Sequence, residues 1–198
     1  MRAAQIIPSR ADAGRDDGEL VLLASKGDRW AREALFGRYV RPVIRRLTRL
    51  LGDPEEAADL AQDTFLVAYA KLHRLKNPNA FEAWLMQIAV RRAHDALRRR
   101  KLRRLLGLYQ PRSEGLAALA TTDATAEQRA ELALLDRTLA RLSAADRIAW
   151  TLRYVEGERL EDVARMTSCS LATAKRRIKR AQEHVARHVS MAEEGASW

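Results

Sequence analysis

The sequence predicts an all-α protein made of two small helical domains joined by a flexible linker. Its 198 residues include only nine glycines and five prolines, which favours helices over a turn-rich sheet protein. Apolar residues recur with a helical period along most of the chain, and no segment shows a defensible strand period. The period lapses between about residues 107 and 124, so we expect the linker there.

The first domain is expected to begin after a flexible leader. Asp53 and Glu56 form a strong helix start, because Asp53 can cap the backbone and Glu56 can reach back to the cap. Asn79 with Glu82 repeats this capping pattern after an Asn-Pro break, and Pro42 predicts a kink in an earlier helix. The expected helices cover about residues 19–25, 30–51, 54–75 and 79–104.

The second domain resumes the helical period at about Thr125. Ser143 can cap a helix that ends at Gly157, and a short helix, a polar turn and a last long helix follow. These helices are expected at about residues 125–142, 143–157, 160–166 and 170–189. The predicted division is a leader (1–18), a first domain (19–104), a linker (105–126), a second domain (127–190) and a tail (191–198).

The formal net charge of +10 indicates a polyanionic partner, with nucleic acid as the first candidate and an anionic membrane surface as the second. Cys169 is the only cysteine, so the chain can form neither an internal disulfide nor a cysteine-built zinc site. No apolar run approaches the length of a membrane span, and residues 1–18 lack the apolar core of a secretory signal. We therefore expect a cytoplasmic protein.

The end of the chain has the layout of a helix-turn-helix, in which the second helix enters the major groove of DNA. An apolar stripe of Leu171, Ala174, Ile178, Ala181 and Val185 lies opposite a basic face. A basic face on a single helix is usually a solvated surface, but the short helix and capped turn before it favour DNA binding. The predicted duplex-binding residues are Ser170, Thr173, Lys175, Arg176, Arg177, Lys179 and Arg180.

Two helices of the first domain carry opposite charges. Asp59, Gln62 and Asp63 surround an exposed Leu66 on the helix of residues 54–75, which suits a basic protein partner with an apolar anchor. An ordinary solvated helix face explains this pattern equally well. The helix of residues 79–104 carries aromatics near its start, for which a core role is favoured, and an arginine-rich far half that suits nucleic-acid backbones.

His184 and His188 lie four residues apart, a spacing that could pair on a metal. The sequence offers no third ligand nearby, so surface histidines are expected instead, and no metal or cofactor is predicted. Cys169 is expected to pack in the turn.

Several segments resemble a known family. Residues 59–65 (DLAQDTF), 81–89 (FEAWLMQIA) and 95–99 (DALRR) resemble region two of extracytoplasmic-function (ECF) sigma factors. Residues 139–142 (LARL), 152–157 (LRYVEG) and 170–177 (SLATAKRR) resemble region four of the same family. The turn at residues 167–169 departs from the family pattern, which usually carries a glycine there.

The resemblance implies an alternative sigma factor that directs core RNA polymerase to specific promoters. Asp59, Gln62, Asp63 and Phe65 would hold the clamp helices of the largest polymerase subunit, with Leu66 beside them. The last helix would bind the minus-thirty-five element, and an anti-sigma protein is an expected further partner. The residues expected to capture the opened minus-ten element are Lys76, Asn77, Asn79, Phe81, Trp84, Arg91, Arg92 and Arg98.

Two alternatives stay open at this point. A helix-turn-helix regulator could bind DNA without a sigma role, although the acidic helix would then have no assigned function. A small DNA recombinase would need an activated nucleophile or clustered metal-binding carboxylates. The serines lie in caps or tails, and Asp59 and Asp63 lack histidine support. The sequence therefore predicts a protein that is not an enzyme.

Overall fold

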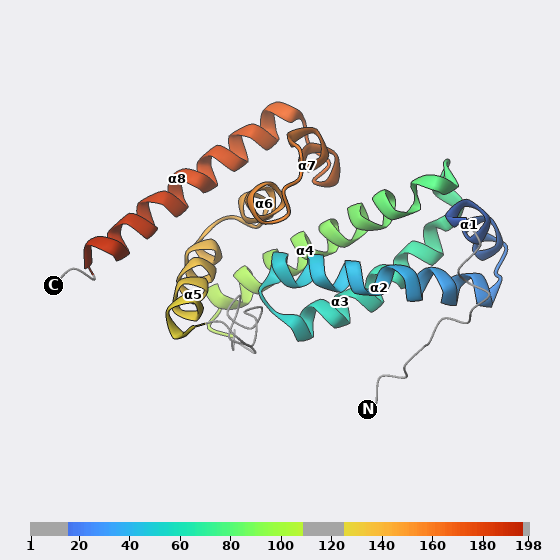
Figure 1. Cartoon of the computed structure of the whole chain (residues 1–198), viewed down its shortest axis with the longest axis horizontal. Coiled ribbons are helices and arrows are strands. Elements are labelled where there is room, and N and C mark those ends of the chain that lie inside the picture. The colour runs from blue at the N-terminus through green and yellow to red at the C-terminus, as the bar shows by residue number, and fades with distance from the viewer. Residues whose placement is uncertain (1–15, 109–124, 196–198) are drawn as a thin grey trace.

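The computed structural model describes residues 16–108 and 125–195, with side chains as far as His188, and in these ranges the chain forms helices and no strand. The first group of helices is α1 (Asp17–Ser25), α2 (Arg29–Leu51), α3 (Pro54–Lys71), η2 (Leu72–Arg74), η3 (Pro78–Ala80) and α4 (Phe81–Leu105). The second is α5 (Ala126–Arg141), α6 (Ala144–Trp150), η5 (Thr151–Val155), α7 (Leu160–Met166) and α8 (Leu171–Gly195). Figure 1 shows the two groups side by side, with α6 next to α4.

The start of α3 follows the expected capping chemistry. The Asp53 carboxylate accepts a hydrogen bond from the Glu56 backbone N–H at 3.0 Å. Glu56 was expected to reach back to this cap, but its carboxylate binds Arg100 of α4 instead. The helix α2 continues through Pro42 and ends at Gly52, which adopts a left-handed φ of 71°.

The expected cap of α4 is wrong. Asn77, rather than Asn79, caps the short η3 turn, because its side chain accepts from the Asn79 N–H at 3.1 Å. The helix α4 then begins at Phe81 without a side-chain cap. Fully buried side chains from α2 and α4, including Leu35, Leu47 and Leu85, make the core of this first group.

The second group differs from its expected form at two places. Ser143 caps α6 as predicted, accepting from the Asp146 N–H at 3.1 Å. The helix expected over residues 143–157 instead changes after Trp150 into the π-helical turn η5. The last helix, α8, extends beyond the expected Val189 to Gly195.

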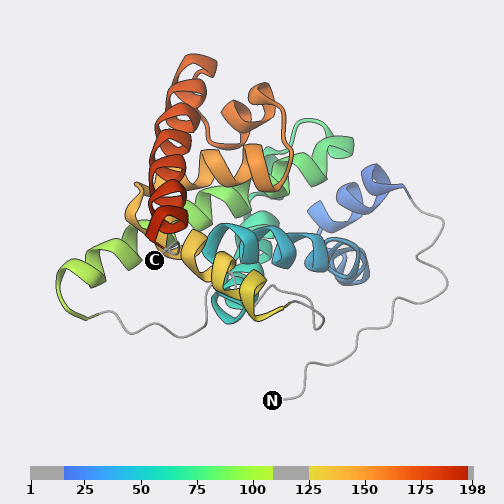
Figure 2. The ribbon, with the colours of Figure 1, turned by 60° about the vertical axis from the view of Figure 1, so that its left-hand side comes forward.

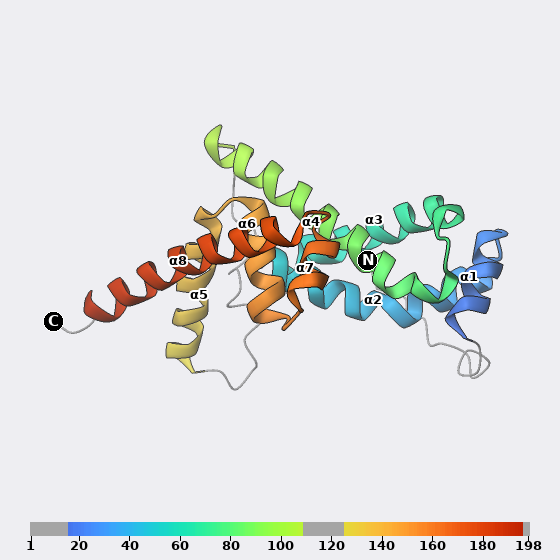
Figure 3. The same cartoon turned by 90° about the horizontal axis from the view of Figure 1, so that it is seen from above.

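The two groups share one core. Ile148, Leu152 and Met166 of the second group belong to the same buried cluster as the side chains of α2, α3 and α4. A smaller cluster of Leu139, Trp150, Ala181 and Val185 joins α5, α6 and α8. Figures 2 and 3 both show α6 lying across α4. None of the helices in the described parts of the chain is long and apolar enough to cross a membrane.

Candidate functional site

The outer face of α3 is acidic and exposed, as the sequence predicts. Asp59, Gln62, Asp63 and Leu66 are all exposed, and the Leu66 residue is 68% accessible to solvent. The opposite face of the helix is buried against α2 and α4. An exposed leucine among acidic side chains is suited to a basic protein partner, because burial of the leucine can anchor the contact.

Phe65 does not belong to this exposed face. The residue is only 2% exposed, and its ring packs edge-on against Phe36 at a centroid distance of 4.8 Å. A buried ring cannot contact a partner without unpacking the core, so the prediction that Phe65 touches polymerase is corrected. Its role is to hold α3 on α2, which positions the acidic face.

Asp63 also links the two charged helices of the first group. Arg92 of α4 donates to Asp63 across 3.0 Å, and the two side chains are 32% and 55% exposed, respectively. An exposed pair of this kind contributes little stability. Because the pair is weak, either side chain can exchange its partner for a group of a binding partner at small cost.

The turn before α4 presents the first predicted minus-ten residues. Lys76, Asn77 and Asn79 are all exposed. Phe81, by contrast, is fully buried and packs against Tyr39 at 5.6 Å between ring centroids. The prediction that Phe81 contacts a base is therefore corrected, because its ring is a core anchor of α4.

Trp84 is half-buried and lines a groove between α3 and α4. The groove has a volume of about 370 Å³, and Trp84, Ile88, Arg91 and Arg92 are among its lining residues. An indole ring beside guanidinium groups can stack on an unpaired base while the cations contact the phosphates. This groove therefore brings together several of the predicted minus-ten residues.

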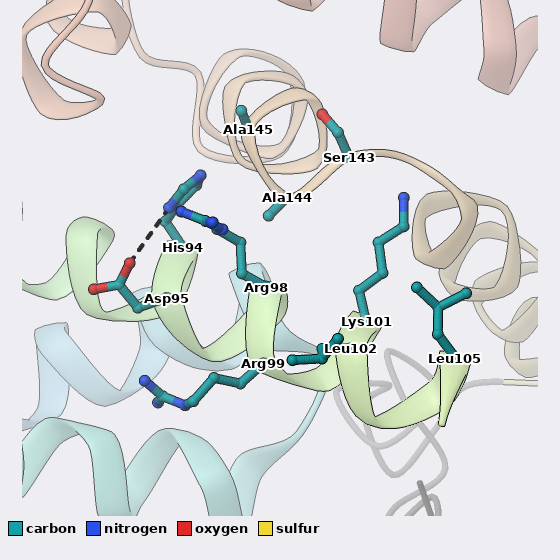
Figure 4. A pocket seen from close by; sticks show the side chains of 10 residues that line it. All are labelled: His94, Asp95, Arg98, Arg99, Lys101, Leu102, Leu105, Ser143, Ala144 and Ala145. Carbon is teal, nitrogen blue, oxygen red and sulfur yellow. Dashed lines mark ion pairs between the residues drawn. The ribbon is translucent and has the colours of Figure 1, made fainter. Parts of the chain in front are cut away.

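The far half of α4 faces a second, larger groove. Figure 4 shows this groove of about 660 Å³ between α4 and the start of α6, with His94 paired to Asp95 in its wall. Arg98, another predicted minus-ten residue, is exposed here. Arg100 differs from its arginine neighbours, because its guanidinium donates to the Leu51 carbonyl at 2.8 Å. This hydrogen bond ties α4 to the end of α2.

The helix-turn-helix is formed by α7, a short turn and α8. Ser168 in that turn has a φ of 51°, the only left-handed value at a non-glycine residue in the described chain. Ser168 therefore adopts a conformation that glycine would accept more readily. Ser170 directly precedes α8, and its hydroxyl accepts from the Thr173 N–H at 3.2 Å.

The basic face of α8 is presented as expected, with Lys175, Arg176 and Lys179 exposed and Thr173 and Arg177 half-buried. Opposite them, Ala174, Ile178, Ala181 and Val185 are buried. Leu171 is 38% exposed, so its expected place in the buried stripe is wrong. It is the first residue of α8.

Arg180 has a structural partner. Its guanidinium binds the buried Asp146 carboxylate through two hydrogen bonds of 2.9 and 2.5 Å, and this contact raises the pKa of Arg180. A guanidinium held in this way is less available to DNA than Arg176. Its predicted DNA contact stays a prediction, with stabilisation of α6 against α8 as a second role.

The rings of the two histidines lie against each other at a tilt of 39°, with their centroids 4.2 Å apart. Burial against α5 lowers the pKa of His184, and the nearby His188 lowers it further. The described residues contain no group of three or more potential metal-binding side chains. Cys169 lies half-buried in the turn, with its sulfur 3.2 Å from the Thr167 hydroxyl.

Sequence patterns did not predict the contacts that bring the two groups together. Arg46, Arg147 and Glu156 carry these contacts, and Arg91 of α4 donates to the Ser168 hydroxyl at 3.2 Å. Each of these pairs is separated by 77 residues or more along the chain. A charged residue gives no local signal of so distant a partner.

Comparison with known proteins identifies the family. The family model for Sigma-70 region 2 matches residues 35–103, and the model for Sigma-70 region 4 matches residues 132–185. The RNA polymerase sigma-H factor of Pseudomonas aeruginosa is 31% identical over 85% of this chain and 91% of its own length. The ECF RNA polymerase sigma factor SigM of Mycobacterium tuberculosis is 32% identical over 87% of this chain and 84% of its own length.

Solved structures share the fold. CnrH, in complex with the cytosolic domain of CnrY, aligns over 88% of this chain and 97% of its own with a TM-score of 0.59 and 22% identity. The sigma factor RpoE in complex with the anti-sigma factor NepR, from Bartonella quintana, aligns over 78% of this chain and 94% of its own with a TM-score of 0.56 and 23% identity. With regions two and four in the same order and relatives of matching length, this chain belongs to the family of ECF RNA polymerase sigma factors.

Proposed function

We propose that this sigma factor binds core RNA polymerase through the exposed face of α3 and promoter DNA through α4 and α8. The observation that supports this division is the separation of charge. The exposed acidic residues around Leu66 lie on one helix, whereas exposed cations cover the far half of α4 and the outer face of α8. Acidic side chains repel phosphates, so the α3 face is suited to protein rather than DNA.

The proposed promoter opening depends on binding and requires no covalent chemistry. The exposed face of α8 would place the complex on the duplex minus-thirty-five element, with Arg176 donating to base edges. In the groove between α3 and α4, Trp84 would stack on an unpaired minus-ten base. Capture of a flipped base offsets the cost of unstacking it, which favours strand opening.

An anti-sigma protein is proposed as a further partner. One structural relative was solved with an anti-sigma factor, and another with a cytosolic domain of a second protein. The proposed site of action is the cytoplasm, where core polymerase and promoters meet. The proposed role requires no catalytic residue, metal or cofactor of this chain.

The division of labour is tested with two substitutions. Arg176→Ala should weaken binding to a duplex minus-thirty-five element by about tenfold, since a bidentate guanine contact contributes about 1–3 kcal/mol. Its binding to core polymerase should not change. Arg29→Ala is the matched control, because it removes the same charge from a side chain that is 92% exposed in α2.

Asp63→Arg should have the opposite pattern, with loss of core polymerase binding and unchanged affinity for the duplex. Because Asp63 pairs with Arg92, the exposed Asp59 provides a second variant, Asp59→Arg, outside that pair. Glu131→Arg, at an exposed site on α5, controls for net charge. Equal losses of both binding activities in the Arg176 and Asp63 variants would contradict the proposal.

A further inference from the structure

One cation of the last helix is held from outside that helix. Among the lysines and arginines that the structure describes on α8, Arg180 alone is bound by a carboxylate of another helix. Asp146 of α6 accepts from Arg180 Nε at 2.9 Å and from Nη2 at 2.5 Å. Lys179, by comparison, pairs with Glu183 within α8 at 3.9 Å. The basic face of α8 therefore contains one guanidinium whose direction is set by α6.

The pair has a buried end and an exposed end. The Asp146 side chain is 6% exposed, whereas the Arg180 side chain is 58% exposed. A buried carboxylate needs a partner for its charge, so it holds the guanidinium firmly. Both hydrogen bonds use the edge of Arg180 that carries Nε and Nη2. The other edge, which presents the two terminal nitrogens, has no hydrogen bond to any residue of the described chain.

Other contacts also dock α8 on α6. Trp150 Nε1 of α6 donates to Gln182 Oε1 of α8 at 2.7 Å. Trp150, Ala181 and Val185 belong to one buried cluster beside this hydrogen bond. The ion pair adds to this packing but is not its main support. Its particular effect is to restrict where the Arg180 side chain can point.

The held arginine lies on the face of α8 that is proposed to bind DNA. Thr173, Arg176 and Arg180 follow one another at spacings of three and four residues, so they form one row along the helix. The row is about 10 Å long, at about 1.5 Å per residue. Two terminal nitrogens of an arginine can donate together to O6 and N7 of guanine. The free edge of Arg180 has the donors that this contact requires.

We propose that Asp146 is a positioning residue for promoter recognition, which holds the free edge of Arg180 toward one guanine of the duplex minus-thirty-five element. This inference rests on the proposed function and adds a specificity determinant to it. A side chain that is already held loses less rotamer freedom on binding, so it gains more from the correct base.

The charge of Asp146 has a second consequence. A carboxylate repels phosphates, so it reduces the contribution of Arg180 to binding of the DNA backbone, which does not depend on sequence. Asp146 therefore raises discrimination between base pairs and lowers affinity for DNA of unrelated sequence. These two effects have opposite signs, which separates positioning from a purely structural role.

The test variant is Asp146→Asn, which keeps the shape of the side chain and removes its charge. Holoenzyme assembled from core polymerase and the full chain is used to select from duplexes randomised over the minus-thirty-five element. The variant should lose about tenfold of the preference for guanine at one position and keep its preferences elsewhere. The free chain should bind a duplex of unrelated sequence about two to eight times more tightly at about 0.1 M salt, because one more positive charge can neutralise a phosphate.

Three further variants control the interpretation. Arg180→Lys keeps the charge but lacks the edge with two donors, so it should lose the same guanine preference. Arg176→Ala should lose a preference at a different position. Asp162→Asn makes the same charge change at the partner of Arg165 within α7 and should keep all preferences. Urea unfolding establishes that each variant is folded.

The mobility of Arg180 is measured without polymerase or DNA. Nitrogen-15 relaxation of the Arg180 Nε–H group, assigned with Arg180→Lys, should show a rigid group in the free wild-type chain and a mobile one in Asp146→Asn. A mobile group in the wild-type chain would overturn the positioning role.

The selection and the binding assays can also overturn the inference. An Asp146→Asn holoenzyme with unchanged base preferences would do so, as would equal weakening of binding to selected and unrelated duplexes. A shift at a different position from that of Arg180→Lys would have the same meaning. Failure of the wild-type chain to form a holoenzyme would instead refute the proposed function, and the relaxation measurement would still report whether Asp146 holds Arg180.

Discussion

A substitution at Gly52 tests how closely the two groups of helices approach each other. It ends α2 with a φ of 71°, and its N–H donates to the Thr48 carbonyl at 2.7 Å. A Cβ atom built at Gly52 would lie 2.9 Å from Asp136 Oδ1 and 3.3 Å from Arg147 Nη2. Gly52→Ala therefore strains the backbone and also displaces the carboxylate of Asp136, which is paired with the buried Arg147.

The two costs can be separated with a matched glycine. Gly157 has a φ of 73°, and a Cβ atom there would have no neighbour within 4 Å. Gly157→Ala should lower the free energy of unfolding only by the cost of a left-handed alanine, about 1–2 kcal/mol. Gly52→Ala should add the cost of a weakened hydrogen bond between charged groups, about 1.5–3 kcal/mol, for a total of about 2.5–5 kcal/mol.

Urea unfolding followed by far-ultraviolet circular dichroism gives both values. One transition is expected for the wild-type protein because the two groups share a core. The difference between the two alanine variants measures the contact across the two groups. If the two variants lose the same stability to within about 0.5 kcal/mol, the close approach at Gly52 is wrong.

Two further predictions concern the second group. Ser168→Gly should raise the free energy of unfolding by about 1 kcal/mol, because glycine removes the backbone strain of a φ of 51°. The variant loses only one exposed hydrogen bond, the one that Arg91 donates to the Ser168 hydroxyl. A lower thermal midpoint than that of the wild type would contradict this. Because burial lowers the pKa of His184, the unfolded chain binds more protons than the folded one at pH values below about 6.5. The stability contributed by neutral His184 is thus present above that pH and lost as the pH falls. The urea midpoint should therefore fall less between pH 7.5 and pH 5.5 in His184→Asn than in the wild type.

Local chemistry explains most of the fold that could be predicted from the sequence. Asp53, Ser143 and Ser170 each place an oxygen within reach of a backbone N–H a few residues ahead, so the start of each helix is decided by its neighbours. The apolar period of α8 likewise follows from side chains three and four positions apart. The exposed acidic residues of α3 and the basic face of α8 could be predicted for the same reason.

Predictions from family motifs were weaker where a motif residue faces inward. Phe65 and Phe81 lie within motifs that resemble binding segments, yet both are buried in the first group. A motif contains buried residues that position a surface as well as exposed residues that form it. Burial depends on which helix covers a side chain, and that information lies in packing rather than in spacing.

The sequence by itself determined most of the helices, the caps at Asp53 and Ser143 and the charge of each exposed face, because these depend on interactions within a few residues. The tertiary structure alone decided that the two groups share one core and that Arg147 and Glu156 become buried partners of α2. These pairs lie about a hundred residues apart, where nothing local distinguishes a buried arginine from a solvated one. Such contacts form only when whole helix surfaces meet, since the free energy that holds them comes from the joint burial of both surfaces.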